Sequence, residues 1–168
     1  MTHNNPPLNA EALYATLAAQ IKSALANTDG LAIVGIHSGG AWLAERLAAE
    51  LQLPDRLGFI DVSFYRDDYA EKGLHHEVKP TQIPFDVDGA TILLVDDVLY
   101  TGRTTRAAIN ELFDYGRPAR ILLAALVDRG GRELPIAADF VAATVPLEDT
   151  LVLRRADDGR LSLTVDHA

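Results

Sequence analysis

The sequence has 168 residues, of which 48% are hydrophobic and 23% are charged, and its formal net charge is −9. This length suits one domain with a substantial core, since a chain of about 150 residues buries roughly two-thirds of its unfolded surface. The acidic balance argues against broad, sequence-independent binding to nucleic-acid phosphates, which needs clustered lysine and arginine. We expect a single domain over residues 1–168, with a flexible arm over residues 1–8.

The residue types that are missing exclude several classes of chemistry. The chain has no cysteine, which excludes disulfides, thiolate catalysis and cysteine-bound metal, and which agrees with a reducing compartment. The N-terminus lacks a basic region followed by an apolar run, and no apolar segment reaches the ~18 residues that a membrane-spanning helix needs. We therefore expect a cytoplasmic protein with no membrane partner.

The first third of the chain predicts a helix, a strand, a second helix and a second strand. Apolar residues recur at i, i+4 spacing after Asn9, a candidate helix cap, and "LAIVGI" is a continuous apolar run typical of a strand buried on both faces. The turn "HSGG" follows this strand. The predicted helices cover residues 10–26 and 41–51, and the predicted strands cover residues 31–36 and 56–65.

The rest of the chain begins with a long polar connection over residues 66–89, broken by glycine and proline. A connection of this length inside a compact domain is usually a functional flap, so we expect a flexible loop. The alternation of strands and helices predicts a doubly wound α/β fold with a mostly parallel central sheet flanked by helices. The later predicted elements are strands over 91–98, 120–128 and 139–146, a helix over 104–116, and a C-terminal edge hairpin over 150–165 that turns at Asp158-Gly159.

The segment "ILLVDDVLYTGRTT", residues 92–105, carries the clearest chemical signal. Its second half offers backbone N–H groups at a helix N-terminus, three threonine hydroxyls and a glycine that leaves room for close approach, which together predict a phosphomonoester site. The Gly-Lys-Ser/Thr of a Walker loop and the GxGxxG dinucleotide fingerprint are both absent. Ionised Asp96 and Asp97 only accept hydrogen bonds, so the neighbouring ligand should carry a vicinal diol or a cation such as Mg²⁺. A diol and a phosphate together indicate ribose 5-phosphate.

A simpler interpretation exists for each half of this motif. Two acidic residues at the end of a strand often form a solvated turn, and Thr105 is a plausible ordinary helix cap. The complete run of residues 96–105 favours the binding site over these interpretations, because ligands of such sheets bind where strands turn into helices.

The same segment resembles the phosphoribosyl pyrophosphate (PRPP) binding motif of type I phosphoribosyltransferases. Its Val-Leu-Tyr-Thr-Gly-Arg-Thr form is similar to that of the pyrimidine operon regulator/uracil phosphoribosyltransferase (PyrR) family. The likeness extends to "VGI" with "LAERLA" in the first third, to "YRDD" at residues 65–68 and to "VDRGGRELP" at residues 127–135. The resemblance implies the type I phosphoribosyltransferase fold.

The resemblance also implies roles for matching residues. Asp96 and Asp97 would be the catalytic carboxylates, and they would hold the ribose hydroxyls. They would also be candidate ligands of the Mg²⁺ that accompanies PRPP. The other implied sites group as follows: PRPP and its 5-phosphate at Val98, Leu99, Tyr100, Thr101, Gly102, Arg103, Thr104 and Thr105; pyrophosphate at His37, Ser38, Gly39, Gly40 and Arg66; and the base at Val127, Asp128, Arg129 and Val145.

The activity implied is the synthesis of UMP and pyrophosphate from uracil and PRPP with Mg²⁺, by a homodimer or higher homo-oligomer. A second implied activity is uridine-nucleotide-responsive binding of pyrimidine operon leader mRNA. Two alternatives stay open, a purine phosphoribosyltransferase and an RNA-binding attenuator with little catalysis. The arginines available for RNA are Arg103, Arg106, Arg117, Arg120, Arg129, Arg132, Arg154 and Arg155.

Two positions depart from the patterns of related families. The family's pyrophosphate loop reads Lys-Thr-Arg-Gly in its RNA-binding members, whereas this chain has His37-Ser38-Gly39-Gly40. His37 is either protonated beside pyrophosphate or a plain polar loop residue. Tyr100 stands where some purine phosphoribosyltransferases carry an aspartate proposed as a base. A phenol is a weak base at neutral pH, so we expect a packing or hydrogen-bonding role for Tyr100.

Overall fold

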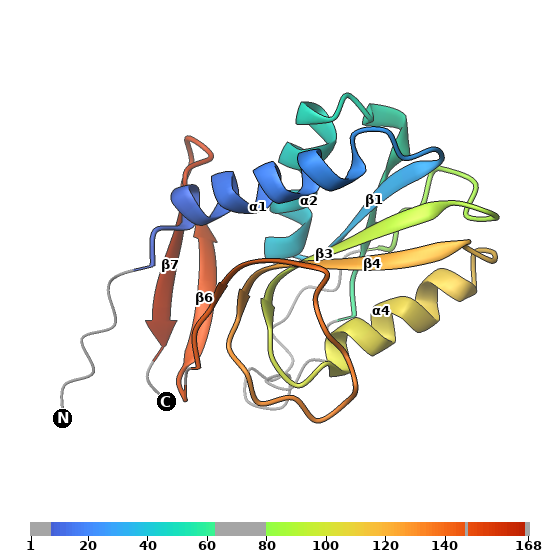
Figure 1. Cartoon of the computed structure of the whole chain (residues 1–168). Helices are drawn as coiled ribbons and strands as arrows, with labels where there is room; N and C mark the ends of the chain where they lie inside the picture. The colour runs from blue at the N-terminus through green and yellow to red at the C-terminus, as the bar shows by residue number, and fades with distance from the viewer. Residues whose placement is uncertain (1–7, 63–79, 147, 167–168) are drawn as a thin grey trace, which may run out of the picture.

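The structure is a computed structural model that describes residues 8–62, 80–146 and 148–166 (Figure 1). The predictions for the arm over residues 1–7, for Arg66, for "YRDD" and for the first part of the loop therefore lie outside the described residues. Within those described ranges, no helix is long and apolar enough to cross a membrane.

The central sheet has five strands, and every neighbouring pair is parallel. Its strand order is β2-β1-β3-β4-β5, so that the chain starts near the middle of the sheet and adds strands first on one side and then on the other. This arrangement confirms the predicted doubly wound parallel sheet. The strands are β1 (Leu31–Ile36), β2 (Leu57–Ile60), β3 (Thr91–Leu99), β4 (Arg120–Asp128) and β5 (Phe140–Thr144).

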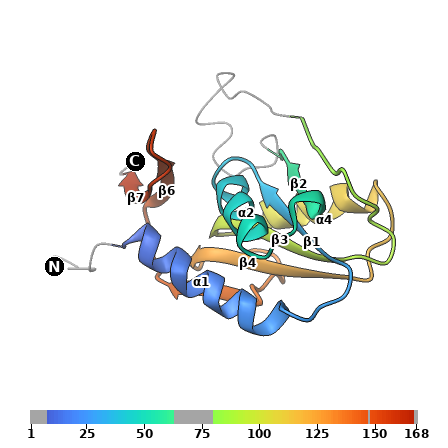
Figure 2. The same cartoon turned by 90° about the horizontal axis from the view of Figure 1, so that it is seen from above.

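Helices cover both faces of this sheet, as Figures 1 and 2 show. Helices α1 (Ala10–Leu25) and α2 (Gly39–Glu50) lie on one face, and α4 (Arg103–Phe113) lies on the other, while η1 (Pro54–Arg56) leads into β2. Side chains alternate along β3, so Leu93 and Val95 join the core under α1 and α2, and Ile92 and Leu94 join the core under α4. This explains why the strand reads as a continuous apolar run.

The predicted C-terminal hairpin is present as β6 (Thr150–Arg155) and β7 (Leu161–Asp166), and it forms a separate two-stranded antiparallel sheet. It joins the core beside α1 and α2, as both views of the molecule show. Arg46 of α2 binds the Glu11 carboxylate at 2.9 Å and the Gly159 carbonyl at 2.6 Å, and the Leu161 N–H donates to Glu11 at 3.1 Å. These bonds tie the hairpin to both helices.

The boundaries of two elements near the predicted site differ from the sequence-based expectation. Helix α2 begins at Gly39, two residues earlier than predicted, and β3 ends at Leu99, one residue later than predicted. The strand continues because β4 pairs with it as far as the Leu99–Asp128 register. Asp96 and Asp97 therefore belong to the last part of a strand, where the predicted strand over 91–98 also placed them.

Candidate active site

The two predicted binding loops meet at the point where the direction of the strand order reverses. The connection after β1 leads through α2 to β2, and the connection after β3 leads through α4 to β4 on the opposite side. Since β1 and β3 are adjacent and parallel, their carboxyl ends lie together. Ligands of open α/β sheets bind at this position. The structure thus brings residues 37–40 and residues 96–105 to one end of the sheet.

Glycine allows the first of these loops to lie directly against the second. An added Cβ atom at Gly39 would overlap the carboxylate of Asp97, and one at Gly40 would overlap the carbonyl oxygen of Val95. Both glycines are buried. The absence of side chains at these positions therefore sets how closely the N-terminus of α2 approaches the end of β3.

The two aspartates are held by the backbone that follows them. Asp96 Oδ1 accepts the Asp97 N–H at 2.8 Å, and Asp97 Oδ1 accepts the Val98 N–H at 2.8 Å. Asp96 is buried and Asp97 is half-buried. Among residues 8–62, 80–146 and 148–166, no group of three or more acidic, histidine or cysteine side chains is arranged to hold a metal ion.

The second loop presents the features of an anion site at the start of α4. Gly102 precedes the helix with a φ of +94°, a left-handed conformation that favours glycine, and the first turn contains no acidic residue. Thr101 Oγ1 accepts the Arg103 N–H at 3.2 Å. The Thr105 hydroxyl is buried and has no hydrogen-bond partner among the described residues. The helix N-terminus, with its positive end of the dipole, favours an anion here.

Several residues of this loop take positions that the sequence did not indicate. The side chains of Val98 and Leu99 pack in the core, which leaves only their backbone for a ligand. The Arg103 guanidinium forms an ion pair with Glu133 at 3.0 Å. Tyr100 is partly exposed, and its ring lies 4.0 Å from the guanidinium carbon of Arg129.

The histidine of the first loop is half-buried between strand ends. The His37 N–H donates to the Ile60 carbonyl at 2.9 Å, and its ring centroid lies 5.4 Å from that of Phe59. The peptide bond between His37 and Ser38 is cis. Ser38 precedes α2 and makes no side-chain capping bond.

The four residues predicted to contact a base lie close together, and one of them, Arg129, contacts Tyr100. Val127 is fully buried within the sheet, and Arg129 is buried with its guanidinium donating to the Glu148 carbonyl at 3.0 Å. The Asp128 carboxylate accepts the Gly130 N–H at 3.0 Å, and its carbonyl accepts the Val145 N–H at 2.9 Å. The Arg129 N–H donates to the Leu99 carbonyl at 3.0 Å, which places the start of the segment that follows β4 against the end of β3.

Arg132 joins these two segments, and the sequence reasoning did not select it as a site residue. Its guanidinium donates to the Tyr100 carbonyl at 2.5 Å, to the Ile136 carbonyl at 2.7 Å and to the Asp128 carboxylate at 2.6 Å. Its sequence signals were its place in "VDRGGRELP" and its place among the arginines available for RNA. A contact between segments about 30 residues apart leaves no periodic pattern in the sequence, so only the folded structure reveals it.

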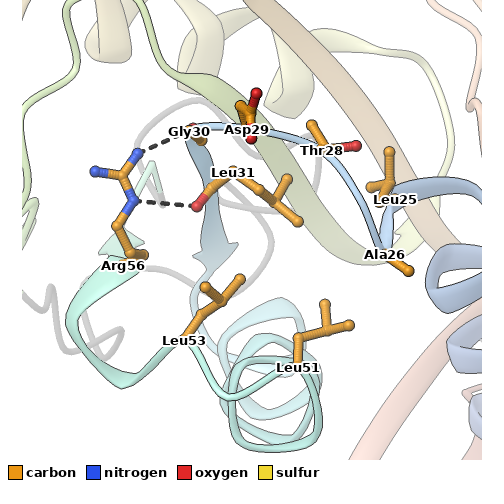
Figure 3. A pocket seen from close by; sticks show the side chains of 9 residues that line it. All are labelled: Leu25, Ala26, Thr28, Asp29, Gly30, Leu31, Leu51, Leu53 and Arg56. Carbon is orange, nitrogen blue, oxygen red and sulfur yellow. Dashed lines mark hydrogen bonds between the residues drawn. The ribbon is translucent and has the colours of Figure 1, made fainter.

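A separate pocket of about 450 Å³ lies at the opposite end of β1 (Figure 3). Leu25, Leu51 and Leu53 contribute apolar side chains to it. Arg56 donates to the carbonyls of Gly30 and Leu31 at 2.9 and 3.1 Å at its rim. None of the predicted site residues lines this pocket.

Comparison with known proteins gives a consistent result. The family model of the phosphoribosyl transferase domain matches residues 5–150. A protein of Ralstonia nicotianae named "Bifunctional protein PyrR" is 54% identical over 156 residues, which cover 90% of this chain and 89% of that protein. A protein of the same name from Thermus thermophilus is 51% identical over 154 residues, covering 89% of this chain and 84% of that protein.

Solved structures show the same fold at lower sequence identity. A hypoxanthine phosphoribosyltransferase from Trypanosoma cruzi superimposes with a TM-score of 0.67 at 22% identity, covering 95% of this chain and 93% of that one. A purine phosphoribosyltransferase from Pyrococcus horikoshii gives a TM-score of 0.61 at 25% identity, covering 82% and 83% of the two chains. The chain therefore belongs to the phosphoribosyl transferase domain family and, within it, to the PyrR family of bifunctional proteins.

Proposed function

We propose that the chain transfers the phosphoribosyl group of PRPP to uracil and releases UMP and pyrophosphate. One observation carries this proposal: Asp96 and Asp97 end β3 immediately before the anion-binding start of α4, and the glycine loop after β1 lies against Asp97. A ribose 5-phosphate fits this order of groups, with hydroxyls at the carboxylates and phosphate at the helix N-terminus. The PyrR relatives support uracil as the base.

The reaction breaks the bond between C1 of the ribose and the pyrophosphate oxygen, forms a bond from C1 to a uracil nitrogen, and releases the proton of that nitrogen to solvent. The ribose ring gains positive charge in the transition state, and pyrophosphate gains negative charge. Asp96 and Asp97 would hold the ribose hydroxyls and stabilise the positive ring, since fixed charges act strongly in a site from which water is excluded. The N–H groups of residues 38–40 would face the leaving pyrophosphate, whereas the His37 N–H donates to the Ile60 carbonyl.

The carboxylate pair also fits the Mg²⁺ that accompanies PRPP in this proposal. Mg²⁺ typically binds one or two protein carboxylates together with substrate phosphates and water, and a dedicated protein cage is not needed. Asp96 and Asp97 supply oxygen ligands of that kind, and no larger cluster exists among the described residues. Bound Mg²⁺ neutralises charge on the leaving group.

A steady-state assay of base specificity tests the proposal. The enzyme would be supplied with PRPP and Mg²⁺ and offered uracil, hypoxanthine, guanine or adenine, with formation of the nucleotide followed by chromatography. We expect turnover with uracil and little with the purines. Turnover of a purine alone would replace this proposal by the purine phosphoribosyltransferase alternative, and no turnover with any base would leave the RNA-binding alternative.

We infer a second activity, binding of pyrimidine operon leader mRNA, from the word "bifunctional" in the names of the relatives. Among the described residues, six of the eight candidate arginines are exposed: Arg103, Arg106, Arg117, Arg120, Arg154 and Arg155. Side-chain ion pairs or hydrogen bonds within the chain are made by Arg103, Arg129, Arg132, Arg154 and Arg155. A filter-binding assay with leader RNA, with and without UMP, tests this activity, and binding equal to that of an unrelated RNA of the same length would refute it.

We also infer a cytoplasmic location and a homo-oligomer. The cysteine-free sequence agrees with the first inference. The second gains no support from α1, because Tyr14, Leu17 and Ile21 turn the apolar face of that helix into the chain's own core. Sedimentation measurements of the full chain would give the oligomeric state.

A further inference from the structure

Two successive carbonyl groups in the loop before α4 are bound by one segment on the other side of the site. The Tyr100 carbonyl accepts a hydrogen bond from Arg132 at 2.5 Å. The Thr101 carbonyl accepts the N–H groups of Glu133 and Leu134 at 2.9 and 3.1 Å. Residues 132–134 therefore bind both carbonyl groups and turn them toward the segment that follows β4.

This arrangement fixes the direction of the N–H groups in the same two peptides. In a planar trans peptide the C=O and N–H groups point in opposite directions. The only cis peptide in the described residues lies between His37 and Ser38, so the peptides after Tyr100 and after Thr101 are trans. With their carbonyls turned toward residues 132–134, the N–H groups of Thr101 and Gly102 point the opposite way. An anion at the start of α4 then meets donors and no carbonyl oxygens.

The Arg132 guanidinium is itself held by three different partners. Nε donates to the Ile136 carbonyl, Nη1 to the Tyr100 carbonyl and Nη2 to the Asp128 carboxylate, at 2.7, 2.5 and 2.6 Å. The side chain of Arg132 is 24% exposed. A rigid planar fork can satisfy three acceptors in fixed directions, whereas a lysine ammonium on a flexible stem cannot reproduce that geometry. Arg132 is therefore oriented independently of any ligand.

We propose that Arg132 is a positioning residue that orients the 5-phosphate loop by binding the carbonyl of Tyr100. The proposal rests on the proposed function, because it takes the loop over residues 100–105 as the phosphate site. Arg132 touches neither the phosphate nor the base. It acts through the backbone, and losing it frees the Tyr100 carbonyl to rotate toward the anion.

Gly131, the residue before Arg132, allows the same segment to lie against the ring of Tyr100. Gly131 has a φ of +77°, and an added Cβ atom there would overlap the Tyr100 ring. The ring of Tyr100 thus lies between Gly131 and the Arg129 guanidinium. The side chain and the carbonyl of Tyr100 are both held by the segment that follows β4, so this segment and the phosphate loop form one unit.

The test compares Arg132→Gln and Arg132→Lys with Arg56→Gln. Arg56 is a matched control, since it also binds two backbone carbonyls, those of Gly30 and Leu31, but at the opposite end of the sheet. The measurements are the Kd of ribose 5-phosphate by calorimetry, the KM for PRPP, the KM for uracil, kcat and the melting temperature. Ribose 5-phosphate reports on the loop without any transfer reaction.

Both Arg132 variants should weaken ribose 5-phosphate binding and raise the KM for PRPP by about tenfold, the effect of losing one strong hydrogen bond to the loop. The KM for uracil and kcat should change much less. Arg56→Gln should lower the melting temperature and leave the Kd unchanged. Arg132→Lys keeps the charge and serves if the Gln variant does not fold. Methylguanidinium should partly restore the affinity of an Arg132→Ala variant.

Wild-type affinity for ribose 5-phosphate in a folded Arg132→Lys variant would overturn the proposal, and so would equal weakening in Arg56→Gln. Failure of the proposed function gives a different result. A chain that uses another base still binds ribose 5-phosphate, and its Arg132 variants still lose that affinity. A wild-type chain that binds no ribose 5-phosphate would overturn the phosphate site and this inference with it.

Discussion

The Asp97 carboxylate lies against the α-carbon of Gly39, so closely that even a methyl group at position 39 would overlap it. Gly39 begins α2, and Asp97 lies near the end of β3. The departure from the family's Lys-Thr-Arg-Gly loop therefore has a structural consequence in this chain. Glycine leaves the space in which Asp97 lies, and the two loops of the site are in direct contact.

Gly39→Ala should impair catalysis while the fold is kept. Either the carboxylate or the start of α2 must move, and a displacement of about 1 Å at a reacting group can cost about 100-fold in rate. We expect kcat/KM for PRPP to fall by about 10- to 100-fold in steady-state assays. Gly159→Ala is the control, because Gly159 borders open space in the hairpin turn, so that its substitution strains a backbone of positive φ but displaces no carboxylate. Unchanged kcat/KM in Gly39→Ala would show that Asp97 is not held by this contact.

The sequence predicted most of the strands well because a buried strand leaves a local apolar pattern, although β2, predicted over 56–65, ends at Ile60. The run over residues 120–128 gave β4 with its exact bounds, since a strand buried on both faces is apolar throughout. The start of α2 was placed too late, because two glycines are poor helix formers in isolation. Here they begin a helix since only they fit against β3. Tertiary packing overrode local propensity at that point.

The part of the site built after β4 was harder to predict for a physical reason. Arg132 contacts Tyr100 across 32 positions of sequence, and no periodicity reports such a pairing. Asp128 was predicted to lie at the base, and its carboxylate accepts hydrogen bonds from Arg132 and from the Gly130 N–H. The roles of Val127, Asp128, Arg129 and Val145 in base binding stay predictions, as do the ligand contacts of the other site residues.

Glu11→Gln should make the protein less stable at neutral pH and less sensitive to acid. Burial raises the pKa of the Glu11 carboxyl, but the hydrogen bonds from Arg46 and Leu161 and the charges of Arg46 and Arg160 outweigh it and lower the pKa below its ordinary 4.5. A carboxyl with a lowered folded-state pKa stabilises the fold above its unfolded pKa, and this contribution is lost as pH falls through the folded value.

Because Glu11 is more than a third exposed, solvent reduces its contribution to about 1 kcal/mol or less at neutral pH. Urea unfolding of wild type and Glu11→Gln at neutral pH and at about pH 3 measures it, with the two curves expected to converge in acid. Lys22→Gln is the control, since it removes an exposed ion pair with Glu50 outside the hairpin contact. A difference between wild type and Glu11→Gln that persists at the lower pH would contradict the assignment.

In Tyr14→Phe, the free energy of unfolding should fall less steeply with rising pH in the alkaline range than it does in wild type. Burial raises the pKa of the Tyr14 phenol, and the hydrogen bond to Glu50 and its negative charge raise it further above the ordinary value of 10.0. A raised folded-state pKa stabilises the fold fully below the unfolded pKa, and the contribution is lost as pH rises above about 10. The variant also loses one hydrogen bond, which costs about 1 kcal/mol at neutral pH.

The measurement is urea unfolding of wild type and Tyr14→Phe at about pH 8 and about pH 10.5, on either side of the ordinary tyrosine pKa. The remaining four tyrosines of the five in the chain titrate in both proteins, so the difference between the two slopes reports on Tyr14. Parallel slopes would mean that the Tyr14 phenol does not resist ionisation in the fold.

Thr104→Ala and Thr105→Val each remove a hydroxyl group from the proposed 5-phosphate site and so test whether that group binds the phosphate. Thr104 is half-buried in the first turn of α4, and the Thr105 hydroxyl is buried without a partner among the described residues. If each hydroxyl donates to the 5-phosphate, either change should raise the KM for PRPP by about tenfold, the effect of one lost hydrogen bond to an anion. Thr105→Val should not lower stability, since it removes no hydrogen bond within the folded chain. Thr16→Ala, on the exposed side of α1, is the control. A KM for PRPP that is unchanged in both variants would show that the 5-phosphate does not bind at the start of α4, even if the aspartates prove essential.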